Sequence, residues 1–311
     1  MQQFSLSANI EEGLSKNFQY IVTPNARDVA SGLVDGYRTG IHSFTIIGSY
    51  GTGKSSFLLA LEKDLQSKGS YSLLNPQTLS ANAKFDVLKI VGDYKDLVSL
   101  MRDKLSVDGT ADNVLDRLRE IYNQAKKQGK FLVIFIDEFG KVLEHAAKNN
   151  PEHELYFMQK LAEFVNVSTR QILLVTTLHQ NFSAYARKLS TLQKEEWTKV
   201  KGRFKELVFI EPVEQLLYLA STQLNAKNDV GVNAESMEKL CQLAKATKFV
   251  SDGFNSDTAN ALYPLEPFSA YAMTQAIQRY GQNERSLFSF LNAKGASSLS
   301  EYKEGFYGIA N

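Results

Sequence analysis

The chain has 311 residues, 43% of them apolar, which is enough to build one large α/β domain or two smaller domains around a hydrophobic core. Thirty-five basic residues against 34 acidic ones leave a net charge of +1, so no overall charge indicates a nucleic-acid, membrane or strongly acidic partner. A single cysteine excludes an internal disulfide, and the lack of a signal peptide or a membrane-length apolar run predicts a soluble, cytoplasmic protein without membrane contact.

The first specific pattern along the chain is a phosphate-binding loop. A helical pattern at residues 25–37 and an apolar strand pattern at 44–47 precede the loop, and a helical pattern at 56–61 follows it. The loop matches G-x-x-x-x-G-K-S, and with the next serine it reads Gly48, Ser49, Tyr50, Gly51, Thr52, Gly53, Lys54, Ser55 and Ser56. Its glycines let the backbone curl around phosphate groups, while the helix N-terminus adds positive partial charge. The pattern predicts that the chain binds a nucleoside triphosphate, with Lys54 on the β and γ phosphates and Ser55 on Mg²⁺.

Strand and helix patterns alternate after the loop. The predicted strands lie at 85–91, 131–136, 172–177 and 206–210, and the predicted helices between them at 96–105, 113–127 and 152–165. This alternation predicts an α/β fold of the P-loop NTPase type, with a parallel sheet sandwiched by helices. Beyond Pro212 the pattern is helical only, at 213–224, 234–247, 268–280 and 284–291. We therefore predict a P-loop core at residues 1–212 and a small all-helical domain at 213–311.

Two carboxylates follow the most apolar of these strands. Six consecutive apolar residues at 131–136 lead directly into Asp137 and Glu138. The pair could be solvated carboxylates at the start of a turn, but the apolar run favours a central strand, whose carboxyl end is where such sheets bind ligands. The pattern is typical of a Walker B motif, in which Asp137 holds Mg²⁺ and Glu138 polarises the attacking water. Because no N-K-x-D guanine-recognition motif occurs, ATP is favoured over GTP, and we expect an ATPase.

The order of these parts resembles the AAA+ ATPases, and within them the initiator-like and switch-like (STAND-like) branches related to origin-recognition proteins. That resemblance implies a polar sensor residue at the end of the next strand, where either Thr177 or His179 fits. For His179 the alternative is a histidine that only bonds the loop backbone.

The same resemblance implies two arginines that act on the nucleotide. Arg203, in Gly202-Arg203-Phe204 just before the strand at 206–210, matches the arginine finger that reaches the site of a neighbouring subunit. Arg285 matches the arginine of a G-x-x-x-R helix in the lid, which is the implied identity of the helical domain. The alternatives are a surface arginine in a basic stretch and a salt bridge on a helix surface.

The resemblance implies a homo-oligomeric motor or nucleotide switch that depends on ATP and Mg²⁺ and controls a partner or effector protein. A narrower resemblance, carried by residues 137–141, 178–180 and 282–288, links the chain to the ATPase modules of bacterial anti-phage defence proteins. Few residues follow the implied lid, so we expect any output domain to be absent or on another chain.

Two other functions remain open. One is a scaffold that binds ATP, turns over slowly and recruits an effector. The other is nucleic-acid binding through residues 187–205, where seven basic residues are interleaved with Trp197 and Phe204 and preceded by Tyr185. A charge-rich helix beside a subunit interface explains that stretch equally well.

Overall fold

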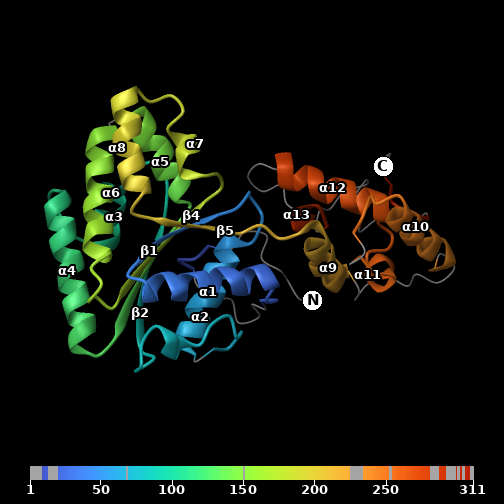
Figure 1. The fold of residues 1–311 in the computed structure, drawn as a ribbon, viewed down its shortest axis with the longest axis horizontal. Coiled ribbons are helices and arrows are strands. Elements are labelled where there is room, and N and C mark those ends of the chain that lie inside the picture. The colour runs from blue at the N-terminus through green and yellow to red at the C-terminus, as the bar shows by residue number, and fades with distance from the viewer. Residues whose placement is uncertain are drawn as a thin grey trace. The chain divides into compact units, whose positions relative to one another are not determined.

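A computed structural model describes residues 9–12, 20–67, 69–149, 151–224, 234–251, 254–280, 287–291, 299, 302 and 305–308 (Figure 1). Its contacts divide the chain into two compact units. The first contains residues 1–48 and 53–209, and the second contains residues 49–52 and 210–311. The domain boundary after residue 212 stays a prediction.

The first unit is built on a five-stranded sheet in the order β2-β3-β4-β1-β5. The strands are β1 (Ser43–Ile47), β2 (Phe85–Val91), β3 (Phe131–Asp137), β4 (Ile172–Leu178) and β5 (Lys205–Val208), and every neighbouring pair is parallel. The predicted parallel sheet is confirmed, although its last strand ends at Val208 rather than at residue 210. Because all strands run the same way, their carboxyl ends lie on one side of the sheet. The phosphate loop follows the carboxyl end of β1, and the acidic pair lies at the carboxyl end of β3.

Helices cover both faces of this sheet (Figure 1). One face carries α1 (Pro24–Arg38) and α2 (Lys54–Gln66). The other face carries α3 (Leu97–Leu105), α4 (Ala111–Lys127), α5 (Phe139–Lys148), α6 (Pro151–Val165), α7 (Phe182–Tyr185) and α8 (Thr191–Lys201). The sequence did not predict α5 and α7, and it offered α8 only as an alternative reading of a basic stretch.

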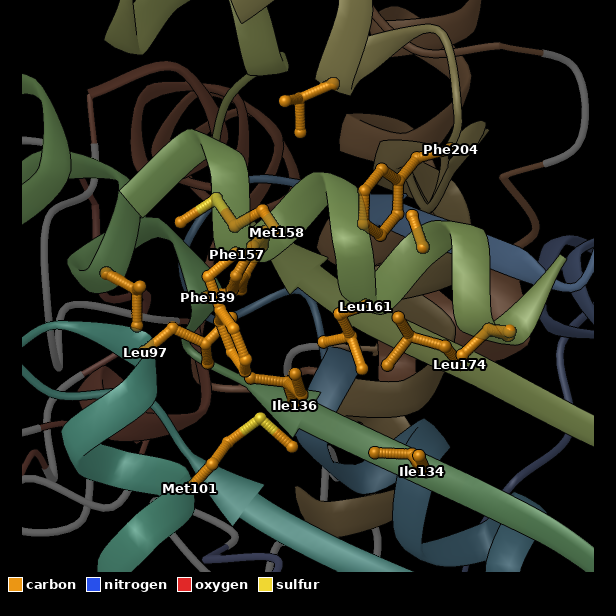
Figure 2. Close-up of a cluster of buried hydrophobic side chains, with 14 of the residues drawn as sticks. Leu97, Met101, Ile134, Ile136, Phe139, Phe157, Met158, Leu161, Leu174 and Phe204 are labelled. Atoms are coloured by element: carbon orange, nitrogen blue, oxygen red, sulfur yellow. The ribbon is translucent and has the colours of Figure 1, made fainter. Parts of the chain in front are cut away.

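The alternation of side chains along β3 explains why the central strands are apolar throughout. Leu132, Ile134 and Ile136 pack into the cluster under α3–α8. Phe131, Val133 and Phe135 pack into the opposite cluster under α1 and α2. A strand buried on both faces needs apolar residues at every position, which is what the sequence shows. Figure 2 shows part of the first cluster, where Phe139 from α5 lies among side chains of β3 and α6.

The elements that the structure describes in residues 210–311 are helices, as predicted, apart from a single β-bridge between Leu265 and Tyr307. The helices are α9 (Val213–Leu224), α10 (Ala234–Ala246), α11 (Ser256–Ala261), α12 (Pro267–Tyr280) and α13 (Leu287–Leu291). They share a core that includes Leu217, Met237, Cys241 and Leu262. The sequence did not predict the short α11. In the described part of the chain, no helix combines the length and the apolar character needed to cross a membrane.

Candidate nucleotide site

The phosphate loop leads from β1 into α2 through a glycine in a left-handed conformation. Gly53 is the N-cap of α2 and has φ +91°. Residues with a side chain rarely adopt this backbone conformation. Lys54, the first residue of α2, donates a hydrogen bond from Nζ to the carbonyl of Gly48 at 2.6 Å. Gly48 in turn donates its N–H to the carbonyl of Leu178 at 3.0 Å, which ties the start of the loop to the end of β4. The N-terminus of α2, which carries the positive end of the helix dipole, therefore directly follows the loop.

Lys54 and the acidic pair lie close enough to influence one another. Burial lowers the pKa of Lys54 to about 8, and the charges of Asp137 and Glu138 oppose that shift. Asp137 is 3% exposed at the end of β3, so its carboxylate is also withdrawn from solvent. A buried cation beside two carboxylates, at the carboxyl edge of a parallel sheet, is an arrangement typical of a functional site.

Thr177 fixes the orientation of the acidic pair. Its hydroxyl donates to Asp137 Oδ1 at 2.5 Å. The backbone N–H of Glu138 lies 3.0 Å from Asp137 Oδ1 and 3.0 Å from the Thr177 hydroxyl oxygen, and it donates to both. Glu138 itself has φ +54°, a left-handed conformation that costs energy for a residue with a side chain. These bonds from β3 and β4 hold that conformation in place.

Gly92, which directly follows β2, packs against the other side of the pair. It donates its N–H to the carbonyl of Asp137 at 2.7 Å. A Cβ at this position would overlap the carbonyl oxygen of Glu138, so only glycine allows this close approach. Strand β2 thus supports the acidic pair through backbone contact alone, a role that the sequence analysis missed.

His179 occupies a different place from Thr177, although either could have been the strand-end polar residue. The Tyr185 hydroxyl lies 3.1 Å from His179 Nδ1 and 3.3 Å from Nε2, and Glu144 lies 3.7 Å from Nε2. Burial lowers the pKa of His179, the charge of Glu144 opposes this shift, and the nearby charge of Lys54 adds to it. Thr177 therefore contacts the Asp137 carboxylate and the Glu138 backbone N–H, whereas His179 contacts Tyr185 and Glu144 and feels the charge of Lys54.

Arg203 lies near the amino ends of the strands, opposite to the carboxyl ends that the phosphate loop follows. Phe44 pairs with Lys205 and Ile47 with Val208, so Arg203 precedes the amino end of β5 while Gly48 follows the carboxyl end of β1. At about 3.3 Å per residue, this offset is roughly 20 Å along the strands. Within its own chain, Arg203 Nη2 donates to Glu163 Oε1 at 2.8 Å, and Asn166 Nδ2 donates to the Arg203 carbonyl at 2.9 Å. Arg203 and the phosphate loop of the same chain are therefore not brought together.

Two other expectations fare differently. Arg285 lies outside the described residues. In the basic stretch, the interpretation as a charge-rich helix fits better than one in which aromatic rings stack on bases, because Tyr185, Trp197 and Phe204 are buried in the core. The Trp197 indole N–H donates to the carbonyl of Phe182 at 2.9 Å, which fixes α8 against α7. The charges of the stretch remain at the surface, where Lys199 pairs with Glu196 at 2.5 Å.

Comparison with solved structures finds distant likenesses. The ORC2 protein of Aeropyrum pernix, in ADPNP–ADP complexes, is 15% identical with a TM-score of 0.42, over 79% of this chain and 69% of that one. PCH-2 of C. elegans is 15% identical with a TM-score of 0.41, over 85% and 65%. Drosophila ORC bound to DNA is 15% identical with a TM-score of 0.41, over 89% and 65%.

The family is identified by a sequence model instead. No curated protein sequence matches the chain. The model of the ATPase family associated with various cellular activities (AAA) matches residues 44–200, half of the chain. The match spans the phosphate loop, the acidic pair and both strand-end candidates. The chain belongs to the AAA family, and it is an ATP-binding and ATP-hydrolysing P-loop enzyme.

Proposed function

We propose that residues 48–56, Asp137 and Glu138 form the site at which this ATPase binds and hydrolyses ATP, and that hydrolysis there switches an oligomer that controls a partner protein. One observation carries the assignment of the site. The fold gathers Lys54, Asp137 and Glu138 from separate elements at the carboxyl edge of the sheet, near enough for the carboxylates to oppose the fall in the pKa of Lys54.

The loop residues bind the triphosphate. Backbone N–H groups around Gly51 and Gly53, both at positive φ, are suited to line phosphate oxygens. Burial makes the charge of Lys54 costly, as its lowered pKa shows, and the oxygens of a bound phosphate would add to the stabilisation that Asp137 and Glu138 already give it. Binding energy is therefore concentrated on the β and γ phosphates, where Lys54 reaches.

Mg²⁺ fits the oxygen ligands that the site offers. Mg²⁺ in nucleotide sites uses one or two protein oxygens and takes the rest from phosphate and water. The Ser55 hydroxyl and the Asp137 carboxylate would hold it, and the bound ion would neutralise charge on the phosphate oxygens. The hydroxyl of Thr177 keeps the Asp137 carboxylate turned to one orientation.

Glu138 activates the attacking water. Its backbone is held by Asp137 and Thr177, whereas its side chain is 36% exposed and pairs with Lys141 at 3.4 Å. An exposed surface pair of this kind is weak, so the carboxylate is available to accept a proton from water.

Arg203 acts on the site of a neighbouring copy. Its place at the amino ends of the strands, roughly 20 Å from its own phosphate loop, supports action on another copy rather than in cis. An arginine there completes a site only when another subunit brings its loop to this end of the sheet. This supports a homo-oligomer in which each site uses residues of two copies.

The phosphate-loop assignment is tested by replacing Lys54 with Ala. The variant is expected to lose about a hundredfold in ATP affinity, because the triphosphate keeps the backbone contacts but loses its charge-assisted bonds. Isothermal titration calorimetry measures this directly. Lys63→Ala, which removes a lysine from the far end of α2, is the matched control and should bind like the parent. Equal affinity of the Lys54→Ala variant and the parent would place the nucleotide elsewhere.

The role of Thr177 is tested by a pair of substitutions. Thr177→Val keeps the shape but removes the hydroxyl, and it is expected to lower kcat about tenfold because Asp137 and the Glu138 N–H each lose a partner. Thr177→Ser restores a hydroxyl and should recover most of the rate. A Thr177→Val protein as fast as the parent, or a Ser variant as slow as the Val variant, contradicts an orienting role for the hydroxyl.

A slow ATP-gated scaffold is the second candidate function. It is favoured by the ion pair of Arg203 with Glu163, because an arginine engaged within its own chain leaves the neighbour's site incomplete. The dependence of turnover per subunit on protein concentration separates the two: a switch that assembles shows a steep rise, and a scaffold stays slow.

A further inference from the structure

A tyrosine that the sequence analysis did not place in the site holds His179. Tyr185, the last residue of α7, is 7% exposed, and its hydroxyl lies 3.1 Å from His179 Nδ1. The two rings meet edge to face, with centroids 5.5 Å apart and an interplanar angle of 77°. The hydroxyl thus contacts the nitrogen-bearing edge of the imidazole, which limits the rotation of the ring.

The position of His179 puts this contact next to the phosphate loop. His179 follows Leu178, whose carbonyl accepts the N–H of Gly48 at 3.0 Å. Gly48 also accepts the bond from Lys54. Two bonds therefore link the backbone beside His179 to the lysine that the proposed function places on the phosphates.

Tyr185 is itself anchored from the far side. Asn181 caps α7 by accepting the N–H of Ala184 at 2.9 Å. The carbonyl of Phe182, which is fully buried, accepts the bond from Trp197. These two bonds hold α7 in place, so the Tyr185 hydroxyl has a fixed position and the imidazole of His179 is oriented by it.

Gly140 provides the space for this pair. It is the second residue of α5, in the helix that begins directly after Glu138. A Cβ at position 140 would overlap the Tyr185 hydroxyl oxygen and lie 3.0 Å from both Cε1 and Nδ1 of His179. Its backbone φ is not positive, so glycine is not required by the helix, where alanine is the better residue. The requirement for glycine comes from the tyrosine and the histidine.

We propose that Tyr185 is a positioning residue for ATP hydrolysis, which orients His179 beside the phosphate loop in a space that Gly140 leaves open. The proposal rests on the ATP site assigned above and adds residues to it. Tyr185 does not touch the nucleotide and acts only through His179.

The test compares Tyr185→Phe, His179→Ala and the double variant with the parent. Tyr185→Phe removes only the hydroxyl and is expected to lower kcat about tenfold, because a misplaced group loses its advantage steeply with distance, while KM for ATP stays within about twofold. The double variant should be no slower than His179→Ala. Tyr122→Phe, another buried tyrosine under the same sheet face, is the control and should match the parent in kcat and melting temperature.

Gly140→Ala provides an independent test, in which a second substitution is expected to restore part of the lost kcat. Alone it should lower kcat by more than Tyr185→Phe does, since the added methyl displaces both side chains. Combined with Tyr185→Phe, which removes the overlapping oxygen, it should recover to the rate of Tyr185→Phe. Recovery of this kind is not expected if Tyr185 only stabilises the fold.

Two results overturn the proposal. One is a Tyr185→Phe protein as fast as the parent. The other is a double variant with His179→Ala that is slowed by the product of the two single effects, which shows independent action. Neither result affects the assignment of the ATP site, because the Lys54→Ala variant tests that assignment separately. If Lys54→Ala binds ATP like the parent, the site assignment fails whatever Tyr185 does.

Discussion

Replacing Glu138 with Gln is expected to lower kcat about a thousandfold while ATP affinity stays within a few-fold of the parent. The amide keeps the size of the side chain and can still bond to water, but it cannot accept the proton that the attacking water loses. Gln also tolerates the left-handed conformation at this position about as well as Glu. A single-turnover assay, combined with a calorimetric titration of ATP, separates the chemical step from binding.

Glu152→Gln is the matched control for that experiment. Glu152 is an exposed carboxylate in the first turn of α6, so its loss should leave turnover unchanged. Turnover of the Glu138→Gln protein within a few-fold of the parent would show that another group activates the water. A parallel loss of ATP affinity would instead move Glu138 from proton transfer to nucleotide binding.

Replacing Arg203 with Ala is expected to lower kcat by at least about a hundredfold with normal ATP binding, because the guanidinium meets charge that develops only in the transition state. The ion pair that it loses with Glu163 is about one-third exposed on both sides, and surface pairs of this kind contribute little to stability. The melting temperature should therefore change little. Lys199→Ala, another basic change on the same stretch, is the control.

Mixing the Arg203→Ala and Lys54→Ala proteins tests whether the arginine acts between copies. A mixed interface pairs an intact phosphate loop from one copy with an intact arginine from the other, so part of the ATPase activity should return. The recovery of ATPase activity is limited by the fraction of interfaces that pair one copy of each variant in the productive order. No recovery at any mixing ratio contradicts action in trans, and so does an Arg203→Ala protein as active as the parent. A defect confined to nucleic-acid binding would return Arg203 to the basic stretch.

The sequence predicted those parts of the fold that depend on local pattern. The run at 131–136 needed a strand buried on both faces, and β3 has that burial. The phosphate-loop spacing placed its glycines at a strand-to-helix turn, where Gly53 has a positive φ. The helical patterns predicted after Pro212 at 213–224, 234–247 and 268–280 correspond to α9, α10 and α12.

The remaining features depend on contacts between distant residues, which no local pattern encodes. Thr177 and Asp137 are 40 positions apart, as are Arg203 and Glu163, and only the fold brings each pair together. The choice between Thr177 and His179 could not be made from spacing, because both fit the end of β4. Trp197 sits among charged residues in the sequence, yet its ring is 1% exposed. A helical pattern through Val142, Leu143 and Ala146 was present for α5, but the acidic pair before it was interpreted alone.

The most direct measurement is a high-resolution structure, by cryo-electron microscopy or crystallography, of the chain with Mg²⁺ and a slowly hydrolysed ATP analogue. We predict the β and γ phosphates in the loop at residues 48–55, with the γ phosphate in contact with Lys54 and facing Asp137 and Glu138. In an assembled particle, we predict Arg203 of a neighbouring copy at the same phosphate. A nucleotide bound away from this loop, or phosphates that contact neither Lys54 nor the backbone around Gly53, would contradict the account.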